Sequence, residues 1–322
     1  MGPFVRIRED VAKLATAHGR QVGTPGHDAA RKHLVSRLAD LGIDGYAGGS
    51  FELPYRSDGQ DFVNLVARLP GADPALSPVL LGAHYDTCED IPGADDNAAG
   101  VAVLLAVAET LKGRHIDRTV LFAFFDAEEP PDFLQPSMGS IRFYEHQRLE
   151  PIHCAIIMDL VGHEVPIHGL EDLVFITGME SDPGLETLVR ECEPTRTIRT
   201  VPILNAYVGD LSDHYVFRIN SRPYLLLTCG RWEHYHRSTD TPDRLDYAKI
   251  DAIADYMCSL TERVCAASLT GPFESYDTTE TELYFLRKTV LPVIDQLGLG
   301  LVLRSRDDID SLVQLMMANF DL

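Results

Sequence analysis

The sequence predicts an α/β fold in which a largely parallel sheet is covered by helices on both faces. Three apolar runs, at residues 79–83, 120–125 and 154–158, have the length and flanking residues of buried strands. Helical patterns lie between strands of this kind, and such alternation is typical of βαβ units. The chain has 322 residues, 45% of them hydrophobic, and can therefore bury a sizeable core without disulfides.

The elements follow from apolar spacing and from residues that begin or end helices. Strands are expected at residues 62–69, 79–83, 120–125, 154–158, 173–177 and 224–228. Helices are expected at residues 4–18, from the turn at 23–26 to Gly42, from near Asn97 to Gly113, and at 247–268. In the second helix Ala30, Leu34, Leu38 and Leu41 share one face, and Gly42 provides the stop.

Residues 1–268 are expected to form one domain, and residues 269–322 a helical extension packed on it. Leu283, Leu286, Val290 and Ile294 recur at helical spacing, with a kink expected at Pro292. A second helical stretch carries apolar residues from Ile309 to Phe320. The extension is interpreted as a packing appendage, and a dimerisation or substrate-lid element is the alternative.

Charge and processing signals restrict the class of protein. With 28 Lys+Arg against 49 Asp+Glu the net charge is −21, which argues against a nucleic-acid binder. The sequence shows neither a signal-peptide pattern nor an apolar run of membrane-spanning length, so a cytoplasmic protein without membrane contact is expected. The 6 Cys form no C-x-x-C pair and are interpreted as free thiols, none of them a zinc ligand.

Candidate metal ligands follow the predicted strands, where ligands of α/β sheets bind. His84 ends one strand, and Asp86 lies two residues later, where a carboxylate can orient the imidazole. Asp95 and Asp96 open the next helix, and one of these carboxylates could bridge two cations.

Two further positions complete the constellation. Glu128 and Glu129 follow the Phe-rich strand. Because adjacent side chains point in different directions, one glutamate can bind a metal while the other acts as a general base. Asp159 ends a third strand, and His236 lies in a later loop. Nitrogen and oxygen ligands without thiolate favour Zn²⁺, with Mn²⁺ or Co²⁺ as alternatives.

In this ordered series the sequence resembles the zinc-dependent aminopeptidase family that includes bacterial leucyl aminopeptidases and, more distantly, glutaminyl cyclases. The resemblance runs from about residue 10 to about residue 268. It rests on residues 23–26, His84-x-Asp86, residues 95–100, 126–129, Gly139-Ser140, Met158-Asp159, 212–214 and 236–241.

The resemblance implies an α/β three-layer sandwich with a mixed, mostly parallel sheet of about eight strands, and two zinc ions. Asp96 would bridge the two ions, His84 and Asp159 would complete one, and Glu129 and His236 the other. Glu128 would be the general base, Asp86 would orient His84, and Tyr235 would bind the substrate carbonyl. The implied enzyme is an aminopeptidase that hydrolyses N-terminal residues of peptides or amino-acyl compounds through a metal-bridging hydroxide.

The sequence departs from the family pattern at two places, and the second keeps a glutaminyl cyclase open. Ala127 stands where the family usually has glycine, and residues 130–138 are longer than the link typical of aminopeptidases. The alternatives are a glutaminyl cyclase-like mono-zinc acyltransferase, an amidase or carboxypeptidase on the same site, and a non-catalytic binding homologue. The C-terminal helices are a candidate surface for pairing with a second copy of the chain.

Overall fold

The computed structural model describes residues 3–196, 198–270, 277–296 and 300–320. Its single sheet runs in the order β1-β3-β5-β4-β6-β9-β7-β8, with β2 paired to β3. The strands are β1 (Asp44–Gly45), β2 (Glu52–Ser57), β3 (Gln60–Leu69), β4 (Val79–His84), β5 (Val120–Phe125), β6 (Cys154–Met158), β7 (Leu173–Thr177), β8 (Arg199–Pro202) and β9 (Tyr224–Thr228). The central strands β5, β4, β6 and β9 are parallel, whereas β3 and β7 run antiparallel to their neighbours β5 and β9.

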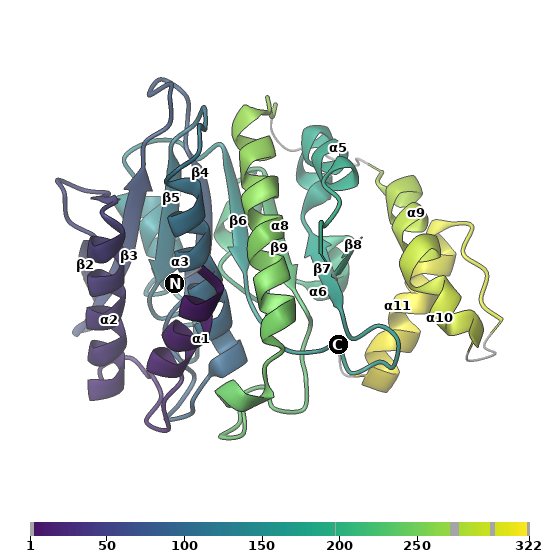
Figure 1. The fold of residues 1–322 in the computed structure, drawn as a ribbon, viewed down its shortest axis with the longest axis horizontal. Coiled ribbons are helices and arrows are strands. Elements are labelled where there is room, and N and C mark those ends of the chain that lie inside the picture. The colour runs from purple at the N-terminus through teal and green to yellow at the C-terminus, as the bar shows by residue number, and fades with distance from the viewer. Residues whose placement is uncertain (1–2, 197, 271–276, 297–299, 321–322) are drawn as a thin grey trace.

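Helices cover both faces of this sheet (Figure 1). The α-helices are α1 (Pro3–Leu14), α2 (Pro25–Leu41), α3 (Gly100–Leu111), α4 (Gly139–Arg142), α5 (Pro183–Glu191), α6 (Asn205–Val208), α7 (Tyr215–Ile219), α8 (Tyr247–Ala266), α9 (Thr279–Thr289), α10 (Leu291–Gln296) and α11 (Arg306–Phe320). One buried cluster joins one face of the sheet to α1, α2, α3 and α8, and a second joins the other face to α4 and α7. The α/β three-layer prediction, with a mixed sheet of about eight strands, is confirmed.

Alternation along each central strand explains these two clusters. In β5, Phe122 and Phe124 belong to the α3 side, whereas Leu121 and Phe125 belong to the α4 side. Successive side chains of a strand point to opposite faces, so a strand buried on both faces is apolar throughout. This is why the strand at residues 120–125 could be predicted from a continuous apolar run.

The helix positions predicted from capping residues and apolar spacing agree with the structure, except at the bounds of two helices. Thr24 caps α2 by accepting a hydrogen bond from the His27 N–H, and Gly42 ends it with a left-handed φ of 62°. The first helix ends at Leu14, not residue 18. The helix expected from Asn97 begins regularly only at Gly100, because Asp96 and Asn97 have non-helical backbone angles within the segment Ala94–Ala99.

The C-terminal helices lie beyond the β8 edge of the sheet (Figure 1). The kink expected at Pro292 is a break between α9 and α10, because proline at the start of α10 has no N–H to continue α9. An Arg199 guanidinium N–H donates to the Thr289 carbonyl at 3.3 Å and ties α9 to β8.

Candidate metal centre

The candidate ligands meet at the carboxyl edge of three parallel strands. His84 is the last residue of β4, Asp159 directly follows β6, and the glutamates follow β5. His84 is aligned with Phe125 of β5, which brings the imidazole beside the turn that carries the glutamates. The sheet register therefore gathers residues that lie up to 75 positions apart in the sequence.

Asp96 lies between the two imidazoles. Its Oδ1 is 3.2 Å from Nε2 of His84, and its Oδ2 is 3.2 Å from Nε2 of His236. On one side Asp159 Oδ1 lies 3.5 Å from Nε2 of His84. On the other, Glu129 Oε2 lies 3.0 Å from Nε2 of His236. The arrangement is two nitrogen–oxygen clusters that share one carboxylate.

The chemistry of these atoms fits two metal ions. His84 Nε2, Asp96 Oδ2, Asp159 Oδ1 and His236 Nε2 are buried and have no hydrogen-bond partner among the described residues. Buried polar atoms are nearly always satisfied, so a convergent group without partners indicates a missing partner. Carboxylate oxygens and imidazole nitrogens without sulfur are a donor set that zinc accepts.

The loop that presents Asp96 is held by its own hydrogen bonds. The Asp240 carboxylate accepts from the backbone N–H of Asp95 at 2.9 Å and of Asp96 at 3.1 Å. The Asn97 amide donates to the Met158 carbonyl at 2.8 Å, next to Asp159. Gly93 has a φ of 57°, and a Cβ there would lie 2.3 Å from the Asp96 carbonyl oxygen. Only glycine permits this close approach.

Arg20 supports the same loop from within the core. Its side chain is 1% exposed and donates to five backbone carbonyls, those of Leu14, Tyr85, Pro92, Gly93 and Asp96. Burial lowers the pKa of Arg20 to about 10, although Asp96 and other carboxylates oppose the shift, so the guanidinium stays charged. Arg20 could not be predicted as part of the site, since a lone arginine after a helix belongs to no motif.

The two adjacent glutamates directly follow a residue of unusual backbone geometry. Ala127 has a φ of 55°, in the left-handed region that favours glycine, so the backbone here explains why glycine is usual at this position and not why this chain has alanine. The Asp86 carboxylate accepts the N–H groups of Glu128 and Glu129, each at 3.1 Å, and its Oδ1 lies 3.3 Å from Nδ1 of His84. Asp86 thus contacts both the imidazole and the glutamate turn.

Mutual charge and burial set the protonation of the centre. Burial would lower the pKa of His84, but Glu128 and Asp159 outweigh it and raise that pKa well above its usual value. Burial raises the pKa of Glu128 strongly and, with the Asp96 charge, raises the pKa of Glu129 to about 8. Four acidic groups packed together repel one another, and divalent cations would relieve that repulsion.

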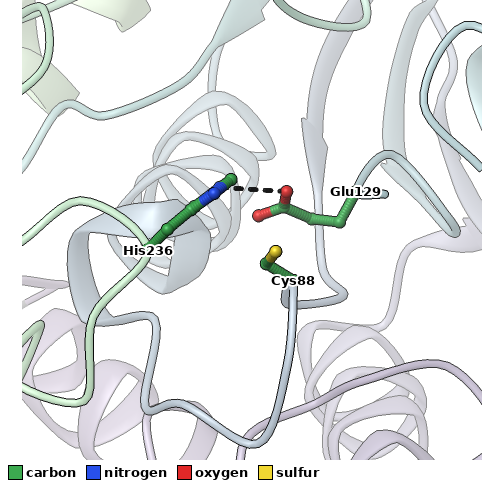
Figure 2. Close-up of side chains that lie close together, drawn as sticks. All are labelled: Cys88, Glu129 and His236. Carbon is green, nitrogen blue, oxygen red and sulfur yellow. Dashed lines mark ion pairs between the residues drawn. The ribbon is translucent and has the colours of Figure 1, made fainter. Parts of the chain in front are cut away.

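One thiol lies beside these ligands. Figure 2 shows Cys88 close to Glu129 and His236, and the Sγ lies within 4.8 Å of their ligand atoms. Cys88 is half-buried, whereas the other five cysteines are buried and free, as predicted. The position of Cys88 could not be predicted, because nothing in its local sequence indicates that the loop after β4 returns to His236.

An apolar cavity of about 520 Å³ opens in front of the glutamates and His236. Tyr235 lines it, and its ring stacks on the His236 imidazole with centroids 3.8 Å apart. Burial and the charges of Asp96 and Glu129 raise the pKa of Tyr235, so its hydroxyl keeps its proton. The structure thus brings all eight predicted site residues to one place.

Comparison with known proteins agrees with this geometry. The family model described as Peptidase family M28 matches residues 64–261, which include every candidate metal ligand. The chain belongs to peptidase family M28. The recognition made from the sequence motifs is thereby confirmed, and the family indicates a hydrolase.

Relatives of this chain occur in bacteria and in mammals. The uncharacterized protein YfbL of Escherichia coli is 27% identical over 232 residues, covering 63% of this chain and 71% of YfbL. Endoplasmic reticulum metallopeptidase 1 of Mus musculus is 25% identical over 238 residues, or 71% of this chain, but the match spans only 26% of that longer protein.

Two solved structures share the fold. The LapA aminopeptidase of Legionella pneumophila has a TM-score of 0.66 at 15% identity, over 82% of this chain and 72% of LapA. Porphyromonas gingivalis glutaminyl cyclase has a TM-score of 0.63 at 20% identity, over 80% of this chain and 96% of the cyclase. Within the described residues, every helix is too short or too polar to cross a membrane.

Proposed function

We propose that this chain is a dizinc aminopeptidase. The observation that carries the proposal is the Asp96 carboxylate, whose two oxygens face the His84 and His236 imidazoles at 3.2 Å each. A single carboxylate placed between two nitrogen–oxygen clusters is what a pair of cations sharing one ligand requires.

His84, Asp159 and Asp96 would hold one zinc, and His236, Glu129 and Asp96 the other. When bound, such ions supply Lewis-acid charge and lower the pKa of a coordinated water. Asp86 contacts Nδ1 of His84 and leaves Nε2 to face the metal. In the metal-bound protein the Asp86 carboxylate would accept the Nδ1–H of His84 and so set the tautomer of the imidazole, as carboxylates behind metal-binding histidines do.

Glu128 would move the proton. Its Oε1 has no hydrogen-bond partner among the described residues, and its Oε2 lies 3.9 Å from Nε2 of His84. Burial raises the pKa of Glu128, so the carboxylate is a stronger base than a solvent-exposed glutamate. It would accept a proton from water and deliver it to the leaving amine, while the protonated Tyr235 hydroxyl would donate to the substrate carbonyl.

The cyclase alternative rests on the long segment after Glu129 and on the shared fold. Pro130 and Phe133 of this segment line the cavity, as a substrate-facing loop would. The aminopeptidase is favoured because both nitrogen–oxygen clusters are complete. Metal analysis separates the two, since the aminopeptidase requires about two zincs per chain and the cyclase one.

The test of the general base is Glu128→Gln. It should lower kcat for an amino-acyl amide by at least about 100-fold, because general-base catalysis contributes that much, while two zincs stay bound. Asp132→Asn, on the same segment but outside the ligand set, should keep both activity and metal. Full turnover in the Glu128→Gln variant would exclude Glu128 as the base.

A further inference from the structure

The C-terminal helices form a wall of the active-site cavity, although they lie beyond residue 261, where the match to the peptidase family ends. At the end of α9, Leu286 and Val290 line the cavity. In α11, Leu312, Val313 and Met316 line it as well. At its other end the same cavity is lined by Asp96, Glu129 and His236, so one space connects the candidate metal ligands with the extension.

A polar network fixes this wall in place. Glu282 of α9 is fully buried, and its carboxylate accepts from the Leu204 N–H at 3.1 Å and pairs with Arg306 of α11. Arg306 also donates to the Tyr207 hydroxyl at 3.1 Å, and that hydroxyl bonds to Asp310. The ring of Tyr207, in α6, lines the cavity. Because the Glu282 carboxylate is buried and has its partners in this one arrangement, the network holds the extension in place as a wall of the cavity.

The size and chemistry of the cavity indicate what it holds. A cavity of about 150 Å³ lined by aliphatic side chains holds a benzene ring. At about 520 Å³ this cavity has room for more than one such group, including the space in front of the metal ligands. The wall of α9 and α11 is wholly aliphatic or thioether at the lining positions, so it stabilises an apolar group and excludes a charged one.

We propose that α11, through Val313 and Met316, selects substrates whose N-terminal residue has a large apolar side chain, of leucine size or larger. This proposal rests on the aminopeptidase function proposed above. Both residues are half-buried and line the cavity, whereas Leu312 beside them is 1% exposed and belongs to the core. Val313 and Met316 are therefore specificity-determining positions and play no part in the proton transfer.

The test compares Val313→Asp with Gln314→Asp, a neighbour on α11 that is exposed and outside the cavity lining. With zinc-loaded protein, Val313→Asp should lower kcat/KM for a leucyl amide by at least about tenfold, because an apolar substrate group would face a buried charge. The alanyl amide should change less than about threefold, since a methyl group has little apolar surface to bury. Gln314→Asp should leave both substrates within about twofold, and zinc content should stay equal in all three proteins.

A second variant keeps the test valid if Val313→Asp folds poorly. Met316→Ala enlarges the cavity without adding charge, and should raise the ratio of tryptophanyl to leucyl amide turnover at least about threefold. Equal losses on leucyl and alanyl amides, or unchanged selectivity in Met316→Ala, would overturn the specificity role while leaving the aminopeptidase intact. Wild-type protein that binds two zincs and cleaves neither amide would instead overturn the proposed function.

Discussion

The histidine of the 212–214 motif should make the protein sensitive to acid. His214 is buried without any exposed surface, its Nε2 donates to the Gly209 carbonyl at 3.1 Å, and its ring stacks on Tyr224. Burial lowers the pKa of His214 to about 4, against an ordinary value of 6.5. The unfolded chain therefore binds one more proton than the folded chain between these two pH values.

The sign and size of the effect follow from that difference. Because the folded pKa is the lower one, the stabilising contribution is fully present above pH 6.5 and is lost as pH falls toward 4. The whole difference amounts to about 3 kcal/mol, and about 2 kcal/mol of it disappears between pH 7 and pH 5. His214→Gln keeps a donor toward Gly209 but cannot take up a proton, so it should lack this contribution.

Urea unfolding at pH 7 and pH 5 measures the effect. Wild type should lose about 2 kcal/mol more of its free energy of unfolding between these pH values than His214→Gln does. His146→Gln, at an exposed position, should behave like wild type. Because the metal centre is unchanged in all three proteins, its own pH dependence cancels from the comparison. An equal loss in wild type and His214→Gln would show that His214 is not held neutral in the fold.

Two further outcomes test the support around the metal centre. Arg20→Lys should lower the free energy of unfolding by about 3 kcal/mol, because one ammonium group cannot bond to all five carbonyls that the guanidinium contacts. The control Arg56→Lys, at the surface, should change the free energy of unfolding by less than about 0.5 kcal/mol. A stable Arg20→Lys protein in thermal unfolding would contradict that role. Cys88→Ser should leave the absorption spectrum of the cobalt-loaded enzyme unchanged, because nitrogen and oxygen atoms complete the ligand set. If the variant instead lost a near-ultraviolet sulfur-to-cobalt band, Cys88 would be a metal ligand.

The central strands could be predicted because each is buried on both faces and so reads as a continuous apolar run. The edge strands could not. In β2, Leu53 and Tyr55 are buried and alternate with exposed residues, but Pro54 between them weakens the strand signal. Proline is tolerated because β2 pairs only with β3. Similarly, the four-residue β8 ends in Pro202 and forms the opposite edge of the sheet.

Some residues of the candidate site could likewise be predicted from the sequence, and others could not. Metal-ligand candidates such as His84 and Asp159 could be found in the sequence, because each ends or follows a recognisable strand and parallel strands end at one edge. Cys88 and Arg20 could not, since their placement depends on how loops return to the centre. The cavity wall is the hardest part to predict, because it depends on contacts between distant parts of the chain, such as the hydrogen bond from Tyr207 to Asp310, 103 positions apart. Helical spacing predicted α11 as an amphipathic element but contained nothing about which surface it would cover.

Some of the acidic residues behind the net charge of −21 are buried together at the metal centre. Asp86, Asp96, Glu128, Glu129 and Asp159 are all less than a tenth exposed. The buried Arg20 guanidinium nearby donates to backbone carbonyls and, among the described residues, to no carboxylate oxygen. Several buried carboxylates cannot all stay charged without compensation, because each loses its hydration and repels the others. Protonation offers one compensation, as the raised pKa values of Glu128 and Glu129 indicate. Two divalent cations offer the other, and only they leave Glu128 charged and able to accept a proton, so in the proposed enzyme the metals and the base depend on each other.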